Sequence, residues 1–233
     1  MNLVIIETEK KSRNKTERLK SSLSKMKINN EYLIERIIRI GSKNGMKRVF
    51  CIINSHDPEL EHYLSSNDFG IPTKLIVPNP ESSMHVLVAL ASIHSEEPFF
   101  IITANSVFIN REFSEFVTYS LLQQDIDGAI SVTGNLNDEK PLGVAMNDED
   151  VIFKLNNSKE GYSWFNGGIY YFSPHILNET NYAFLSHITS VEKFLHFLIE
   201  SGYILKGFSF SKIIRIYSSA DIILAEDWIG KNE

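Results

Sequence analysis

The sequence predicts a three-layer α/β/α fold on a doubly wound, mostly parallel sheet, with a mixed-sheet extension in the second half. Through the first half of the 233 residues, short apolar runs alternate with segments of helical period. Parallel strands require such long crossovers, which pack as helices against the sheet. In the second half the apolar runs crowd together with turn residues between them, as in a mixed sheet. We found no linker or internal repeat, and we expect a single domain over residues 1–233.

The chain opens with an apolar run at residues 3–6, whose length and β-branched character predict a buried parallel strand. Residues 7–30 are charged and serine-rich. Only Leu19, Leu23 and Met26 fall there at a loose helical spacing, so we expect a loop with one helix at most.

A helical stripe of apolar residues follows at residues 33–40, and we expect Gly41 and Gly45 to end this helix. The spacing of apolar residues and the positions of turn residues predict the remaining elements. In chain order they are a strand at 48–54, a helix from 58, a strand at 74–77, a helix at 83–92, a strand at 99–102, a helix at 112–122, strands at 128–133, 143–146, 151–155 and 168–172, a helix at 191–201, strands at 204–208 and 213–216, and a helix from 221.

The charge balance narrows the classes of partner. The formal net charge is −6 and the sequence pI is about 5.7, so there is no global positive field to hold nucleic acid or an anionic membrane. Basic residues do gather in residues 10–27. A cluster of this kind forms either a solvated face or an anion-binding loop.

The single cysteine, Cys51, lies in an apolar run, where a thiol behaves as a small buried hydrophobe. No disulfide framework or cysteine metal site is possible within the chain. The apolar run at residues 3–6 is too short for the core of a signal peptide, and no stretch reaches the length of a membrane span. We therefore expect a cytoplasmic protein.

Two motifs carry a resemblance to a known family. The chain reads INNEYLIER at residues 28–36 and NGGIY at residues 166–170. These resemble the V-N-G-K-P-L-I-E-R and N-x-G-I-Y motifs of the sugar-phosphate nucleotidyltransferases, which join a sugar 1-phosphate to an NTP and release pyrophosphate. The resemblance covers almost the whole chain and implies a GT-A-like, nucleotide-diphospho-sugar transferase-like fold. It also implies that Asn166, Gly167 and Gly168 contact the sugar, and that Asn30 replaces a turn glycine at positive φ.

The nucleotide side of the family pattern is only partly kept. Residues 4–13 read VIIETEKKSR where the family has a strand followed by A-A-G-x-G-S-R, so Ser12 and Arg13 remain while Glu9 stands at a glycine position and repels phosphate. Residues 80–85, PESSMH, occupy the place of the turn over which the nucleobase sits. The resemblance thus implies nucleotide binding by Ser12, Arg13, Ser82 and Ser83.

The catalytic candidates are Arg13 and Lys25. Arg13 is able to form a bidentate pair with phosphate oxygens. The family's catalytic lysine falls near residue 23, and Lys25 or Lys27 is the nearest basic substitute.

Both metal positions of the family are replaced. Mg²⁺ is expected for the family, but FFIITANSVF at residues 99–108 places Asn105 at one metal-binding aspartate and IRIYSSADI at residues 214–222 places Arg215 at the other. We therefore predict no metal site. Either the Arg215 guanidinium stands in for the metal charge and holds a phosphate, or the site has decayed and an Asn105–Arg215 hydrogen bond closes it. Asp221 matches a family residue that caps the last helix.

These replacements favour a nucleotidyltransferase-like protein with weakened or lost catalysis that retains nucleotide or nucleotide-sugar binding. The alternatives are an active nucleotidyltransferase with altered metal use and a non-catalytic regulatory or protein-binding homologue. A glycosyltransferase ranks lowest, because Asp125 and Asp127 have the metal-motif spacing but precede a strand instead of following one. Trp164 and Phe165, ahead of the NGGIY strand, either line a sugar or base pocket or belong to the core.

Overall fold

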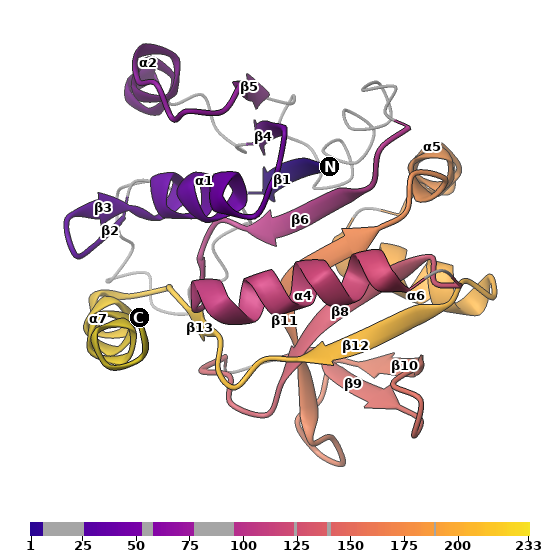
Figure 1. Ribbon diagram of the computed structural model, residues 1–233. Coiled ribbons are helices and arrows are strands. Elements are labelled where there is room, and N and C mark those ends of the chain that lie inside the picture. Colours follow the sequence, from indigo (N-terminus) through magenta and orange to yellow (C-terminus); the bar gives the residue numbers. More distant parts are fainter. Residues whose placement is uncertain (7–25, 53–57, 77–95, 124, 139–140, 189) are drawn as a thin grey trace.

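A computed structural model describes residues 1–6, 26–52, 58–76, 96–123, 125–138, 141–188 and 190–233. Their strands form a nine-stranded sheet and two small two-stranded sheets. Helices cover both faces of the large sheet (Figure 1). The predicted three-layer α/β/α class is confirmed.

The first half of the large sheet is parallel. Strand β1 (Asn2–Ile6) lies between β4 (Arg48–Ile52) and β6 (Phe99–Thr103), and β5 (Thr73–Ile76) lies outside β4. The chain runs outward from β1 to β5 and then returns to the other side of β1. Because the strand order reverses there, the carboxyl ends of β1 and β6 form a topological switch point, where open α/β sheets bind their ligands.

The second half is the predicted mixed extension. Strand β11 (Trp164–Phe172) runs antiparallel to β6 and to β8 (Gly128–Thr133), and β12 (Leu205–Ser209) is parallel to β8. Strands β9 (Gly143–Met146) and β10 (Ile152–Asn156) form an antiparallel pair at the sheet edge.

Strand β11 begins earlier than the sequence predicts. Trp164 and Phe165, expected ahead of the strand, belong to it and pair with Val144 and Gly143 of β9. The register of β11 against β8 then shifts between Asn166 and Tyr170. This irregularity divides β11 into two paired segments, and only the second one carries the apolar signal of a strand.

The helices divide between the two faces of the sheet. Helices α1 (Leu33–Lys43), α2 (Pro58–Ser66) and α4 (Asn110–Leu122) contribute to one hydrophobic cluster. Helices α5 (Ile176–Leu185) and α6 (Val191–Glu200) contribute to the other. Helix α5 was not predicted from the sequence, since its apolar residues follow no clear stripe.

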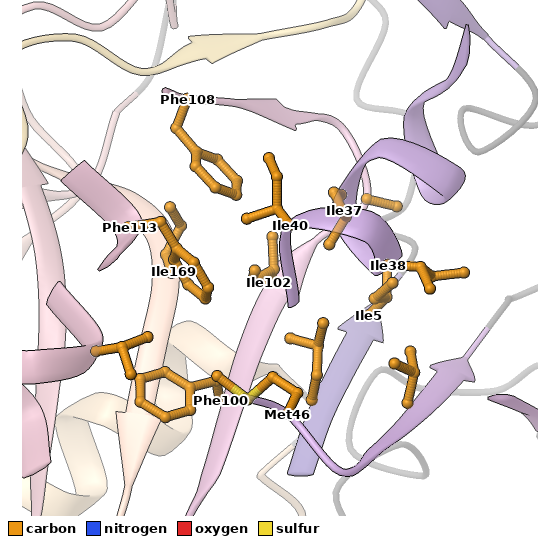
Figure 2. Close-up of a cluster of buried hydrophobic side chains, with 14 of the residues drawn as sticks. Ile5, Ile37, Ile38, Ile40, Met46, Phe100, Ile102, Phe108, Phe113 and Ile169 are labelled. Carbon is orange, nitrogen blue, oxygen red and sulfur yellow. The ribbon is translucent and has the colours of Figure 1, made fainter. Parts of the chain in front are cut away.

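Side chains of the central strand β1 point alternately to the two faces of the sheet and so contribute to both clusters. Leu3 and Ile5 of β1 point into the cluster with α1 and α4, and Val4 and Ile6 point into the cluster with α5 and α6. Figure 2 shows the first cluster, where isoleucines of α1 lie near Ile102, Phe108 and Phe113, and Phe100 lies beside Met46. Such a strand, buried on both faces, is typical of a parallel sheet.

Gly41 does not end the first helix as expected, because α1 continues to Lys43. A Cβ atom on Gly41 would lie 2.5 Å from Leu3 Cδ2, so this glycine allows α1 to pack closely on β1. Gly45, with φ of 75°, follows the helix and turns the chain toward β4.

A third cluster holds the C-terminal helix α7 (Ser219–Asn232) against the small strands β2 (Lys27–Ile28), β7 (Ser106–Val107) and β13 (Ile214–Arg215), and β3 (Glu31–Tyr32) pairs with β2. The β2–β3 turn has Asn29 at φ of 50° and Asn30 at φ of 66°. Asn30 therefore takes the left-handed conformation predicted for it. Among the described residues, no helix is long and apolar enough to cross a membrane.

Cys51 is fully buried in β4, as predicted, and burial raises the pKa of its thiol to about 12. Because the thiolate is the reactive form, we expect the native protein to react with Ellman's reagent at least about 100-fold more slowly than the unfolded chain. Absorbance with and without guanidinium chloride measures both rates. Equal rates would show that the thiol is accessible in the native state.

Candidate functional site

Three separate segments converge at the carboxyl end of β6. The residue after the strand, Ala104, donates its backbone N–H to Ile6 O of β1 at 2.8 Å, so the following turn lies beside the end of β1. Pairing of β13 with β7 places Arg215 opposite Ser106. Pairing of β11 with β6 places Ile169 opposite Ile102 and brings the turn before it to the same edge. We call Thr103, Asn105, Asn166, Gly168 and Arg215 the switch-point site.

The Arg215 guanidinium is the centre of this site. The residue is only 9% exposed. Nη1 donates to Thr103 Oγ1 and Nη2 donates to Asn166 O, each over a long 3.4 Å. Nε is buried and has no hydrogen-bond partner, and none of the ion pairs among the described residues includes Arg215. The site therefore contains a buried cation without a neutralising carboxylate in that part of the chain.

The backbone of Arg215 is held firmly. Asn137 Oδ1 accepts the Arg215 N–H at 2.7 Å, and Asn137 Nδ2 donates to Arg215 O at 2.9 Å and to Asp221 Oδ1 at 2.8 Å. Asp221 also forms a capping box with Ser218 at the start of α7, which confirms its predicted capping role. The sequence did not single out Asn137, because it lies in a loop without any motif.

The hydrogen bond between Asn105 and Arg215, which the alternative of a decayed site predicted, does not form; each side chain has other partners among the described residues. Asn105 is fully buried, its Nδ2 donates to Ile216 O at 3.5 Å, and its Oδ1 has no partner among the described residues. The β7–β13 register explains the difference, since Arg215 pairs with Ser106 and its side chain runs on toward Thr103 and β11.

The turn at Asn166 makes room for the guanidinium. Asn166 Oδ1 accepts the Gly168 N–H and Asn166 Nδ2 donates to Tyr170 OH, both at 2.9 Å. Gly168 has φ of 81°, and a Cβ atom there would lie 2.6 Å from Arg215 Nη2 and 2.7 Å from Thr103 Oγ1. The Asn166 side chain thus shapes the turn. The sugar contacts expected of Asn166, Gly167 and Gly168 stay predictions.

Two nearby tyrosines supply no negative charge. Burial raises the pKa of Tyr170, with the Arg215 charge opposing this shift. Burial likewise raises the pKa of Tyr217 to about 12 against the effect of Arg215, and its hydroxyl donates to Asp138 Oδ2 at 3.0 Å. Both phenols are therefore neutral at pH 7.

The residues of this site do not fit the Mg²⁺ ion that the family resemblance implies. Mg²⁺ prefers hard, anionic oxygen ligands in octahedral geometry. Here a neutral amide and a guanidinium cation stand at the two positions where the resemblance implies ligands, and the described residues contain no group of three or more His, Cys, Asp or Glu able to hold a metal.

The five residues predicted for nucleotide binding and catalysis lie outside the described part of the chain. They are Ser12, Arg13, Lys25, Ser82 and Ser83. Their assignments stay predictions.

Trp164 lines a cavity of about 440 Å³ together with the ends of β8 and β12. Trp164 is 37% exposed, and Glu112, a buried lining residue, accepts the Ser211 N–H through Oε1 at 3.0 Å. The remaining lining residues are Gly134, Asn135, Ser209, Phe210 and Ser211. Of the two alternatives left open for Trp164, this position favours a residue that lines a pocket over a core residue, and a sugar or base as the ligand stays a prediction.

Gly168→Ala should lower the free energy of unfolding by about 1–3 kcal/mol, because the new Cβ atom meets positive φ and the guanidinium together. Urea denaturation measures the change. Gly161→Ala is the matched control, with φ of 80° but no atom within 4 Å of the added Cβ, so it isolates the backbone strain. Equal losses in the two variants would mean that the Arg215 contact contributes nothing.

No protein-family model and no curated protein matches the sequence. Solved structures do match. The inositol-1-phosphate CTP transferase from T. maritima is 16% identical with a TM-score of 0.78, over 99% of this chain and 96% of that one. A putative glucose-1-phosphate thymidylyltransferase from Bacillus anthracis, in complex with a sucrose, is 12% identical with a TM-score of 0.77, over 100% and 96%. HddC from Yersinia pseudotuberculosis, complexed with GMP-PN, is 15% identical with a TM-score of 0.75, over 97% and 98%.

At these identities the comparisons establish the architecture. The match extends over nearly the full length of each neighbour as well as of this chain. This chain therefore has the fold of the sugar-phosphate nucleotidyltransferases, at 12–16% sequence identity to these three structures.

Proposed function

We propose that this chain is a nucleotidyltransferase-like protein that binds a nucleotide or nucleotide sugar at the switch-point site and has weakened or lost nucleotidyl transfer. The observation that carries the proposal is the buried Arg215 guanidinium at the carboxyl end of β6, which has no carboxylate partner among the described residues. A cation in this place attracts a phosphate group.

Two further observations support ligand binding. The site lies where the strand order reverses, which is where ligands bind in open α/β sheets. The matching HddC structure contains GMP-PN, and the matching B. anthracis structure contains a sucrose. Nucleotides and sugars are therefore the first ligands to test on this chain.

The chemistry explains why catalysis should be weak. In nucleotidyl transfer an oxygen of the sugar phosphate attacks the α-phosphorus of the NTP, the bond to the β-phosphate breaks, and pyrophosphate leaves. Charge builds up around the α-phosphorus, and divalent ions on carboxylates normally neutralise it. Asn105 and Arg215 provide no such carboxylates.

Thermal unfolding with a panel of NTPs and nucleotide sugars tests the binding part. A ligand at 100 times its Kd stabilises the folded protein by about 2.7 kcal/mol, so a genuine ligand should raise Tm clearly. Pyrophosphate release with NTPs and sugar 1-phosphates, in Mg²⁺ and in Mn²⁺, tests the catalytic part. We expect a Tm shift with little or no release.

The two assays give separable outcomes. Brisk pyrophosphate release would favour an active nucleotidyltransferase and refute the loss of catalysis. If no compound in the panel shifts Tm, nucleotide binding is refuted and a regulatory or protein-binding role becomes the better explanation.

A further inference from the structure

We propose that Arg215 replaces the divalent metal of this site: its guanidinium binds a phosphate group of the ligand directly, so binding requires no Mg²⁺. This inference rests on the proposed nucleotide-binding function and specifies how the ligand is held. It follows from the contacts of Arg215 and from the failure of the site to fit a metal ion.

The first step is the free-energy cost of burying the positive charge of the guanidinium. Removing a charge from water costs several kcal/mol even after relaxation, and buried charges are normally paired. Arg215 is 9% exposed, its two hydrogen bonds are 3.4 Å long, and its Nε has no partner among the described residues. The site is therefore short of an anion.

The second step is that the nearby acidic side chains of the described chain are engaged elsewhere. Asp221 accepts from Asn137 through one oxygen and from Tyr217 N and Ser218 N through the other. Asp138 accepts from the Tyr217 hydroxyl. The anion is therefore expected to come from a ligand.

The third step is the charge balance. Two carboxylates and a divalent ion, the arrangement implied by the family motifs, sum to zero. Asn105 and Arg215 together carry one positive charge without any metal. Replacing both positions removes the two carboxylates that would repel a phosphate and supplies a cation that would attract it, so the two changes act in the same direction.

The fourth step is geometry. A guanidinium presents a planar fork of donors that matches two oxygens of one phosphate group. Asn137 clamps the backbone of Arg215 on both its N–H and its C=O, and the absence of a side chain at Gly168 leaves room for the fork. The cation is thus held in position before the ligand arrives.

Isothermal titration calorimetry in EDTA and in Mg²⁺ tests the inference, with inorganic pyrophosphate and the nucleotide that gives the largest Tm shift as probes. The wild-type Kd should agree within about twofold between the two buffers. Arg215→Gln should weaken binding in EDTA by about 10–150-fold, which corresponds to the loss of a hydrogen bond to a charged group. Arg215→Lys should recover part of this loss, because it keeps the charge without the fork.

A second variant reverses the proposed exchange. Asn105→Asp combined with Arg215→Asp should abolish binding in EDTA and make it dependent on Mg²⁺ or Mn²⁺. Arg111→Gln is the matched control, since this exposed arginine pairs with Glu115 on the surface and lies outside the site. Circular dichroism and thermal unfolding show that each variant is folded.

The outcomes separate this inference from the proposed function. Nucleotide binding that disappears in EDTA, or that Arg215→Gln leaves unchanged, overturns the inference and leaves nucleotide binding intact. Pyrophosphate binding through Arg215 without any nucleotide binding supports the inference and refutes the nucleotide function. Binding of neither probe refutes both.

Discussion

Phe100→Ala is expected to lower the free energy of unfolding by about 3–5 kcal/mol, the range for removing a buried ring from a core. Phe100 is fully buried in β6. Its ring lies 5.2 Å from that of Tyr171, 5.9 Å from that of Phe116 and 6.0 Å from that of Phe113. The substitution therefore opens a cavity between the sheet and α4.

Chemical denaturation of the wild type and the variant measures the effect. Phe153→Ala is the control, because Phe153 is 59% exposed on the edge strand β10 and its removal should change stability by no more than about 0.5 kcal/mol. Equal losses in both variants would contradict the assigned core.

Asp221→Ala should cost about 2–3 kcal/mol, because it removes a helix cap and leaves several donors without their partner. Asp221 Oδ2 accepts from the N–H groups of Tyr217 and Ser218 and from the Ser218 hydroxyl, while Oδ1 accepts from Asn137. Since Asn137 also clamps Arg215, we expect the same variant to weaken phosphate binding in EDTA.

Asp227→Ala provides a matched control on the same helix. Asp227 pairs with Lys231 on the exposed face of α7, and such surface pairs contribute only about 0.3–0.5 kcal/mol. Thermal unfolding and pyrophosphate titration of both variants provide the comparison. A normal pyrophosphate Kd in a folded Asp221→Ala variant would refute the link from Asp221 through Asn137 to Arg215.

Much of the fold was predictable because its signals are local. The apolar runs that became β1, β4 and β6 are short and β-branched or aromatic, and the stripe that became α1 has a clear helical period. Strands β8 and β9 agree with the predicted bounds. The capping role of Asp221 and the turn at Asn30 also followed from residue type and local position.

The errors arose where distant contacts override local preference. Glycine commonly ends a helix, yet α1 continues past Gly41. The missing side chain of Gly41 instead allows the α1 backbone to pack closely on Leu3 of β1. Trp164 and Phe165 precede the apolar run of their strand, but pairing with β9 extends β11 to include them. The Asn105–Arg215 hydrogen bond failed for a similar reason, because strand register sets the direction of the arginine side chain.

The sequence by itself determined that Asn105 and Arg215 stand where the family resemblance implies metal ligands, since both lie in recognisable strand motifs. The tertiary structure decided what Arg215 contacts. Arg215 is buried, is held by Asn137, which lies 78 positions away along the chain, and fits against Gly168, which lies 47 positions away. No local sequence pattern specifies contacts between residues so far apart. The lack of a carboxylate partner for Arg215 within the described part of the chain is therefore visible only in the assembled sheet.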